Sequence, residues 1–326
     1  DYYFHASFAQ LSEIVNRQQT IIITDSNLFQ HYKTALEPWK TIVIPAGEQH
    51  KQQETVNNII QQLFDFEADR KTTLVGFGGG VVTDITGYVA AIYMRGLSFG
   101  FVPTSVLAMV DASIGGKNGI DVGLLKNMIG VIRQPNFLLF DVSLLQTLPQ
   151  EEWSNGFAEI IKHACIKDES MFSLLENNSI AYFQENIQAL SSLIQRNVLL
   201  KTRVVIDDEY EQGDRKLLNF GHTLGHAIEN EHQLMHGHAI AIGMVYAAKV
   251  SAALKGFPDT DRIIRVLQQY NLPIHIAFSV SKAMHLLKMD KKRVNNAVNY
   301  VLLQSLGKAN YQQVSFTELE SLLNNN

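Results

Sequence analysis

The chain has 326 residues, 46% hydrophobic and 18% charged, a composition typical of a globular protein of about two domains. Its formal net charge of -5 disfavours a nucleic-acid-binding role, because proteins that bind phosphate backbones normally carry a basic excess. The single cysteine, Cys165, excludes an internal disulfide and favours a reducing compartment. Residues 1–10 lack a signal-peptide pattern and no run of about 18 apolar residues occurs, so we predict a cytoplasmic protein without a membrane partner.

Short β-rich runs recur through the first half of the chain, separated by segments of helical length. They cover residues 20–24, 41–44, 72–77, 99–102 and 137–140. Strands that alternate with helices form βαβ units, which predicts an α/β fold with a Rossmann-like parallel sheet and helices on both faces over residues 1–150. This domain should bind a nucleotide-like ligand at its strand ends. Asp25 and Glu48 follow two of the runs, where each can bind a ribose or act as a cap or turn residue.

The pattern changes after Leu148-Pro149. Apolar residues recur at helical spacing from residue 151 to about 277, and glycine and proline near residues 256–258 and 272–273 mark breaks between helices. A short strand is expected at residues 297–303. We predict that residues 151–326 form a second, helical domain, with the active site in the cleft between the two domains.

A glycine-rich segment, residues 72–84 (TTLVGFGGGVVTD), runs from a strand into a helix. Glycines let the backbone approach a pyrophosphate, and free N–H groups at the helix start attract its charge, which favours a phosphate site over a tight turn without a ligand. The fingerprint G-x-G-x-x-G fits poorly, because the frames opened by Gly76 and Gly78 end in Val81 and Thr83. An ordinary Rossmann dehydrogenase is therefore disfavoured.

Histidines are concentrated between residues 222 and 238, which hold five of the eleven. His222 and His226 are four residues apart, which places both on one face of a helix, as in the metal-binding H-x-x-x-H arrangement. By spacing alone, His222 can equally act with His236 or His238. Histidines that serve only the structure are a further alternative.

Glu159 is the best candidate for the carboxylate that would complete a zinc site of three protein ligands. It lies three residues before Lys162 in an apolar helical segment, so the pair is predicted to be buried, and buried charges are usually bound to something. A surface ion pair between the two is the alternative. Cys165 is interpreted as a small core residue.

Cationic side chains recur near glycines in otherwise apolar stretches. For each residue alone, a solvated surface position is the favoured interpretation. Lysines on glycine-rich loops, however, can bind a phosphate together with backbone N–H groups. Together they predict an acidic, phosphorylated substrate. The set comprises Arg95, Lys117, Lys126, Lys201, Arg215 and Lys291.

Eight ordered motifs resemble the 3-dehydroquinate synthase family of sugar-phosphate cyclases and cover roughly residues 25 to 303. They are 78–84 (GGGVVTD), 93–96 (YMRG), 103–105 (PTS), 110–117 (VDASIGGK), 126–130 (KNMIG), 158–162 (AEIIK), 218–226 (LNFGHTLGH) and 236–244 (HGHAIAIGM). Three positions depart from the family's usual residues: Thr83 and Leu125 replace glycines, and His238 replaces a frequent acid.

The resemblance implies NAD and zinc, with cobalt as an alternative metal, and a homodimer. It implies that Glu159, His222 and His236 hold the metal, and it assigns His226 to the substrate side. The residues implied to line NAD are Asp25, Glu48, Lys51, Gly79, Gly80, Asp84, Thr104, Ser105, Asp111, Lys117, Lys126, Thr147 and Leu148. Those implied to bind substrate are Lys117, Lys126, Asn127, Lys291 and, across the dimer, Arg95. Those implied in catalysis are Asp111, Lys162, Lys201, Arg215, Asn219 and His226.

The implied activity is that of a lyase of the shikimate pathway, which leads to chorismate and the aromatic amino acids. It would convert 3-deoxy-D-arabino-heptulosonate 7-phosphate to 3-dehydroquinate and phosphate by transient NAD oxidation, β-elimination of phosphate, re-reduction and intramolecular aldol closure. The alternatives are a 2-deoxy-scyllo-inosose or epi-valiolone synthase, a metal-dependent polyol dehydrogenase, and a non-catalytic metal- or nucleotide-binding protein. Asn219, His226 and Lys162 favour the dehydroquinate branch.

Overall fold

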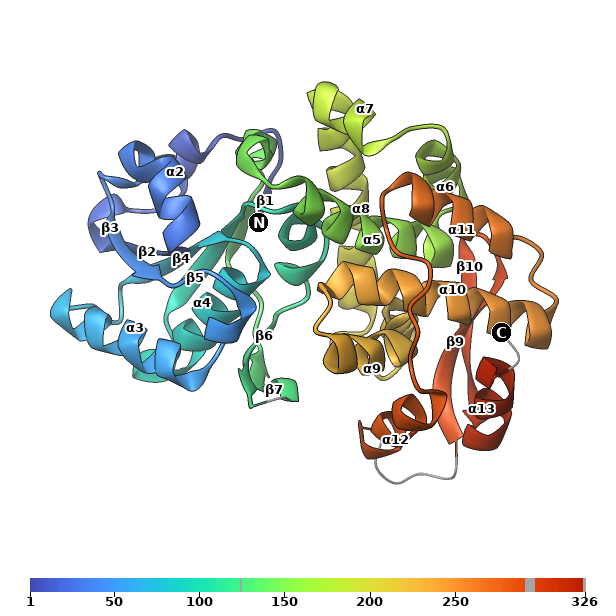
Figure 1. Ribbon diagram of the computed structural model, residues 1–326. Helices are drawn as coiled ribbons and strands as arrows, with labels where there is room; N and C mark the ends of the chain where they lie inside the picture. Colours follow the sequence, from blue (N-terminus) through green and yellow to red (C-terminus); the bar gives the residue numbers. More distant parts are fainter. Residues whose placement is uncertain (124, 291–296, 325–326) are drawn as a thin grey trace. The chain divides into compact units, whose positions relative to one another are not determined.

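The structure, a computed structural model, describes residues 1–123, 125–290 and 297–324 (Figure 1). Its residues fall into two units, each with its own core. Unit 1 comprises Asp1–Glu152 and Asn186–Val198, and unit 2 comprises Trp153–Glu185 and Leu199–Asn326. The segment Asn186–Val198 comes from the half of the chain that was expected to form the second domain.

Unit 1 is built on a six-stranded sheet in the order β1-β8-β5-β4-β2-β3. Every neighbouring pair is parallel. The strands are β1 (Tyr2–Tyr3), β2 (Thr20–Asp25), β3 (Lys40–Ile44), β4 (Thr73–Gly78), β5 (Ser98–Pro103) and β8 (Phe137–Leu139). The five predicted strands are thus confirmed, and only the two-residue β1 was not anticipated.

The helices of unit 1 follow from its parallel strands, since each strand must be reached by a crossover. They are α1 (Leu11–Ile14), α2 (Ser26–Leu36), α3 (Gln53–Asp65) and α4 (Gly80–Ile92), to which Asn186–Val198 adds the first part of α8 (Ile187–Asp207). Figure 1 shows α2 on one side of the sheet and α3 and α4 on the other, as right-handed crossovers require when the chain moves from β2 to β3 and then back to β4 and β5. The reversal makes the carboxyl ends of β2 and β4 a topological switch point, where such sheets bind ligands.

Burial on both faces explains why the strands of unit 1 are almost continuously apolar. Ile21, Ile22 and Ile23 in β2 are all buried, and Ile22 packs in one core cluster with Val75 and Phe77 of β4. The β-branched residues also favour extended backbone.

An antiparallel hairpin of β6 (Lys117–Val122) and β7 (Leu125–Ile132) also belongs to unit 1. The glycines of these stretches predicted loops, and that prediction was wrong because both stretches are paired strands. Gly119 pairs with Gly130, and a Cβ on Gly119 would lie 2.5 Å from the Ile129 carbonyl oxygen. These glycines therefore permit close pairing of two strands and do not mark a loop.

Unit 2 is mainly helical, as predicted. Its helices are α5 (Gln150–Lys167), α6 (Glu169–Glu176), α7 (Ile180–Glu185), the second half of α8 (Ile187–Asp207), α9 (His222–His232), α10 (His236–Lys255), α11 (Thr260–Gln269), α12 (Val280–Asp290) and α13 (Phe316–Asn324). Helix α10 has the length and mean hydropathy of a membrane-spanning helix, but 72% of its apolar window is buried inside the protein. It is the central core helix of this unit.

A second hairpin, β9 (Ala297–Ser305) and β10 (Lys308–Ser315), completes unit 2. The strand predicted at residues 297–303 is confirmed as β9, which reaches α10 through a hydrogen bond from the Leu303 N–H to Ser251 Oγ (2.9 Å). Strand β10 was missed. Only Val314 among its residues is buried, so its sequence lacks the alternation that marks a half-buried strand.

Candidate metal centre and nucleotide site

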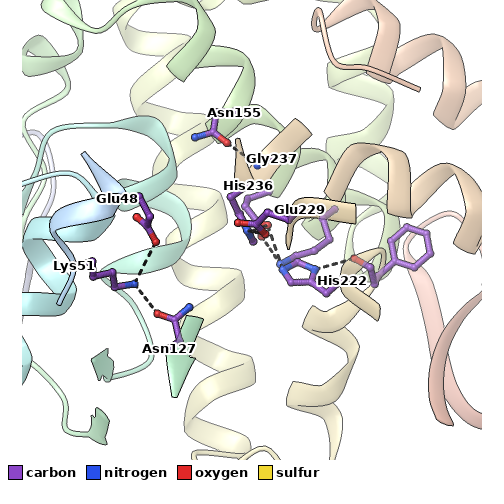
Figure 2. Close-up of polar contacts among 11 residues, drawn as sticks. Glu48, Lys51, Asn127, Asn155, His222, Glu229, His236 and Gly237 are labelled. Carbon is purple, nitrogen blue, oxygen red and sulfur yellow. Dashed lines mark hydrogen bonds and ion pairs between the residues drawn. The ribbon is translucent and has the colours of Figure 1, made fainter. Parts of the chain in front are cut away.

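Three side chains from separate helices of unit 2 converge on one point. Glu159 lies inside α5, His222 is the first residue of α9, and His236 is the first residue of α10. Glu159 Oε1 lies 3.6 Å from His222 Nε2 and 3.3 Å from His236 Nε2. One ligand atom from each residue lies within 4.8 Å of the other two. Figure 2 shows both imidazoles directed toward this point.

The spacing of these atoms fits a divalent metal. Ligand atoms bound tetrahedrally to zinc at about 2.0–2.1 Å lie about 3.3–3.4 Å apart, close to the two distances from Glu159 Oε1. Two imidazoles and one carboxylate are also the donor set of catalytic zinc sites that keep a position open. The chemistry and spacing of Glu159, His222 and His236 therefore fit a divalent metal ion.

Backbone packing holds the two histidines in place. Gly221, directly before His222, has a φ of 78°, and a Cβ there would lie 2.9 Å from the Ile240 carbonyl oxygen of α10. Gly237, directly after His236, donates its N–H to Asn155 Oδ1 at 2.6 Å. Because Asn155 lies four residues before Glu159 on α5, this bond fixes the start of α10 beside the carboxylate that faces His236 (Figure 2).

The charges at the centre are buried and interdependent. Glu159 is fully buried, and its Oε2 is ion-paired with Lys162 Nζ, so the pair predicted from the sequence is buried as expected. Burial, together with the Lys162 ammonium, lowers the pKa of His222 well below its usual range, which leaves a neutral imidazole able to bind a cation. Burial also acts to lower the pKa of His236, but hydrogen bonds with Glu159 and Glu229 raise it to about 9.

The other residues of the histidine cluster lie outside the three-ligand set. His226 is exposed one turn along α9, with its ring centroid 5.1 Å from that of His222. Neither His232 nor His238 belongs to any group of three potential ligands among the described residues. Cys165 is a fully buried core residue of α5.

Three further predicted site residues lie in unit 2. Lys201 on α8 and Arg215 are buried, and Asn219 is half-buried. Arg215 donates from Nη1 to the Glu209 carbonyl oxygen at 2.5 Å, and Asn219 donates from Nδ2 to Glu211 Oε1 at 2.5 Å. Lys291, also predicted to bind substrate, lies outside the described residues.

In unit 1 the glycine segment forms the expected turn between β4 and α4. Gly79 is the N-cap of α4, and the Gly78 carbonyl accepts the Thr104 N–H at 3.0 Å, which brings Thr104 and Ser105 beside the turn. The departure at Thr83 is accommodated, because its hydroxyl donates to the Gly80 carbonyl (3.0 Å) within the first helical turn. The start of α4 therefore presents backbone N–H groups at the carboxyl end of β4, as a phosphate site requires.

Lys51 links several of the residues implied to line NAD. Its ammonium lies 2.6 Å from Asp84 Oδ2. Figure 2 shows its contacts with Glu48 Oε1, at 4.0 Å, and with Asn127 Oδ1, to which it donates at 2.6 Å. Burial acts to lower the pKa of Lys51, but the carboxylates of Asp84, Glu48 and Asp121 raise it above its usual value. The side chain is thus a buried ammonium held by acids.

Asp25, at the end of β2, is the N-cap of α2. Its Oδ1 accepts the N–H groups of Asn27 (2.9 Å) and Leu28 (3.0 Å). Asp25 is therefore a helix cap, one of the alternatives predicted for it. It also lies at the topological switch point, where such sheets bind ligands.

The remaining predicted residues of unit 1 are distributed along it. The Thr147 hydroxyl, directly before Leu148, lies 3.1 Å from Tyr32 OH. Asp111 is half-buried in a short π-helix, Ala108–Ala112. Lys117 pairs with Ile132 at the base of the hairpin, whereas Lys126 lies next to its tip. The structure therefore does not bring these two lysines to one point of the hairpin.

Arg95 is exposed at the end of a short turn, Tyr93–Arg95, with a φ of 67°. Met94 before it has a φ of 49°. Two consecutive left-handed residues that are not glycine cost about 1–2 kcal/mol each, a strain typical of a functional position.

Two buried residues beside Glu159 and His236 were not predicted from the sequence. Asn155 is a buried amide in the helix of Glu159, and Glu229 is a buried carboxylate seven residues after His222. The signal for Glu229 was available, since it stands three residues after His226 on the same helix face, but it was hidden by attention to histidine spacing.

Comparisons with known proteins agree with this geometry. The family described as 3-dehydroquinate synthase matches in two parts, its N-terminal part over residues 41–155 and its C-terminal part over residues 156–293. A 3-dehydroquinate synthase from Coxiella burnetii (strain CbuG_Q212) is 41% identical, over 97% of this chain and 92% of its own length.

Two solved structures share the fold. A 2-epi-5-epi-valiolone synthase from Streptomyces hygroscopicus subsp. jinggangensis 5008, with NAD+ and Zn2+ bound, superposes with a TM-score of 0.89 at 26% identity, over 100% of this chain and 95% of its own. A 2-deoxy-scyllo-inosose synthase complexed with carbaglucose-6-phosphate, NAD+ and Co2+ gives 0.85 at 25% identity, over 99% and 95%. From the two family matches and the identity over nearly its whole length, the chain belongs to the 3-dehydroquinate synthase family.

Proposed function

We propose that this protein is an NAD- and divalent-metal-dependent 3-dehydroquinate synthase that converts 3-deoxy-D-arabino-heptulosonate 7-phosphate to 3-dehydroquinate and phosphate. The observation that carries the proposal is the convergence of Glu159, His222 and His236 in a chain of this family. The pairing of NAD+ with Zn2+ or Co2+ in the two related cyclases supports both cofactors.

Unit 1 would bind NAD at the carboxyl ends of its parallel strands. The N–H groups at the start of α4 would bind the pyrophosphate, and Asp25, at the switch point, would bind a ribose. The proposed contacts are Asp25, Glu48, Lys51, Gly79, Gly80, Asp84, Thr104, Ser105, Asp111, Lys117, Lys126, Thr147 and Leu148.

Unit 2 would hold the metal and the reacting carbons. A bound divalent cation supplies Lewis acidity toward a substrate hydroxyl, and bound NAD supplies a reversible hydride acceptor. Lys162 neutralises Oε2 of Glu159 and leaves Oε1 toward the two imidazoles. His226, exposed beside His222, would move protons, while Lys162, Lys201, Arg215, Asn219 and Asp111 would position the substrate.

The substrate phosphate would be bound by Lys117, Lys126, Asn127 and Lys291, with Arg95 reaching it across a homodimer. Lys117, Lys126 and Arg95 are exposed cationic side chains, the kind of group that binds phosphate oxygens. We further propose that the protein works in the cytoplasm, without nucleic-acid or membrane partners.

Phosphate release from the heptulosonate phosphate tests the proposal. With catalytic NAD we expect release that stops when a chelator removes the metal and that leaves no net NADH. Glu159→Gln should abolish both metal binding and release. Stoichiometric NADH would indicate a polyol dehydrogenase instead, and turnover of another phosphorylated sugar in place of the heptulosonate would indicate one of the other cyclases.

A further inference from the structure

The imidazole of His236 lies between two carboxylates. Its Nε2 is 3.3 Å from Glu159 Oε1, and its Nδ1 is 3.3 Å from Glu229 Oε2 (Figure 2). Glu229 comes from α9 and is only 4% exposed. Burying a carboxylate costs free energy unless it meets a positive charge or hydrogen-bond donors. The position of Glu229 against this ring therefore suggests that the imidazole is its partner.

The two histidines of the centre share one arrangement. In each, Nε2 faces Glu159 and Nδ1 faces an acceptor, which is the Phe220 carbonyl oxygen for His222 (3.2 Å) and the Glu229 carboxylate for His236. An acceptor at Nδ1 holds the proton there and leaves the Nε2 lone pair toward the metal position. Metal-binding histidines commonly donate their second N–H in this way, and a carboxylate partner also makes the ring more basic.

We propose that Glu229 is a positioning residue of the metal centre, which fixes the tautomer and orientation of His236 and strengthens it as a ligand. This inference rests on the proposed function, since it assumes that Glu159, His222 and His236 bind the metal. The family resemblance implies an acid at position 238, where this chain has His238. Glu229 supplies the centre with a second carboxylate from another position.

A competing arrangement must be separated from this one. His226, Glu229 and His236 also place ligand atoms within 4.8 Å of one another, so Glu229 can be drawn as a direct ligand. The two arrangements differ in what they require. If Glu229 positions His236, then His222 is essential for binding and the charge of Glu229 tunes the affinity. If Glu229 is a ligand, its carboxylate is essential for binding and His222 is not.

Metal affinity and the Co2+ absorption spectrum of Glu229→Gln, Glu229→Ala and His222→Ala proteins test the proposal. We expect Glu229→Ala to weaken Zn2+ binding about 10–100-fold, measured by competition with a chelator. Glu229→Gln, whose Oε1 can still accept the hydrogen bond from His236 Nδ1–H, should lose less affinity and keep the wild-type Co2+ band. His222→Ala should lose that band.

Glu231→Gln is the matched control, because Glu231 lies on the same helix, is ion-paired with Lys282 at 3.5 Å and belongs to none of the groups of potential metal ligands among the described residues. It should bind metal as the wild type does. Wild-type affinity in Glu229→Ala would overturn the proposal, as would loss of the Co2+ band in Glu229→Gln while His222→Ala retains it.

Two measurements keep these outcomes separate from other failures. Thermal unfolding of the metal-free variants shows whether Glu229→Ala acts through folding, and in that case the isosteric Glu229→Gln decides the question. Metal affinity is measured without substrate. A wild type that binds metal but releases no phosphate would therefore refute the proposed function and leave the role of Glu229 standing.

Discussion

Substitution of Gly237 by alanine should disrupt the metal centre through backbone packing alone. A Cβ at this position would lie 2.1 Å from the Asn155 carbonyl oxygen and 2.8 Å from its carbonyl carbon. Such atoms do not approach closer than about 3 Å, so α10 and α5 must separate by roughly 1 Å at this contact. Since His236 precedes Gly237 and Glu159 lies one turn from Asn155, the gap between the two ligands must change as well.

The expected magnitudes follow from that displacement. Overpacking of this kind costs about 1–3 kcal/mol, which lowers the melting temperature of a unit this size by roughly 3–10 °C. Zinc tolerates only about 0.2 Å in its ligand distances, so we expect the affinity to fall at least tenfold, about 1.4 kcal/mol. Calorimetric titration with Zn2+ and thermal unfolding of the metal-free protein measure the two effects.

A second glycine in the chain provides the control for this experiment. A Cβ on Gly79 would meet Ser105 Oγ at 3.5 Å, an ordinary contact, and its backbone angles suit alanine. Gly79→Ala should therefore leave zinc affinity unchanged. If Gly237→Ala also bound zinc with wild-type affinity and melted within about 1 °C of the wild type, the close approach of α5 and α10 would be refuted.

Three further outcomes are expected. The pKa of metal-free His236 is raised to about 9, so this imidazole is protonated at pH 7 and must release its proton to bind a metal. Zinc affinity should therefore rise with pH up to about 9, and binding at pH 7.5 should release about one proton. Calorimetric titrations in buffers of different ionisation enthalpy measure the number of protons released. Lys51→Met leaves Asp84 without its cation and should destabilise the protein by about 3–5 kcal/mol, while adding Asp84→Asn should restore much of the loss in denaturant unfolding. Arg262→Ala breaks a two-pronged ion pair with Glu176, from Nε at 2.8 Å and Nη2 at 2.5 Å, and should cost about 1 kcal/mol, which Arg262→Lys should not recover.

The sequence predicted the strands of unit 1 well because their signal is local. A run such as Ile21-Ile22-Ile23 is buried on both faces, and burial of this kind shows directly in composition. Strand β10 and the hairpin of β6 and β7 gave no such signal. Their pairing depends on glycine contacts and exposed polar residues, which read as loops along the chain.

The choice among the histidines shows a different limit. Helical periodicity paired His222 with His226, and the two do share a face of α9. The third ligand, however, depends on where α10 begins relative to α5, and that is set by Gly237 fitting against Asn155. No spacing within one helix encodes such a contact. Only the resemblance to a family identified His236, and nothing in the sequence analysis identified Glu229.

The placement of both imidazoles at helix starts has an electrostatic consequence. The N-terminal ends of α9 and α10 carry partial positive charge, which disfavours a cation beside them by up to about 2 kcal/mol at a partly buried site. The buried carboxylates of Glu159 and Glu229 offset this repulsion. In the metal-free protein they are balanced by the Lys162 ammonium and by the proton on His236. Metal binding therefore exchanges a proton for a cation between residues that are already in place, so the affinity should depend on pH more than on any rearrangement of the helices.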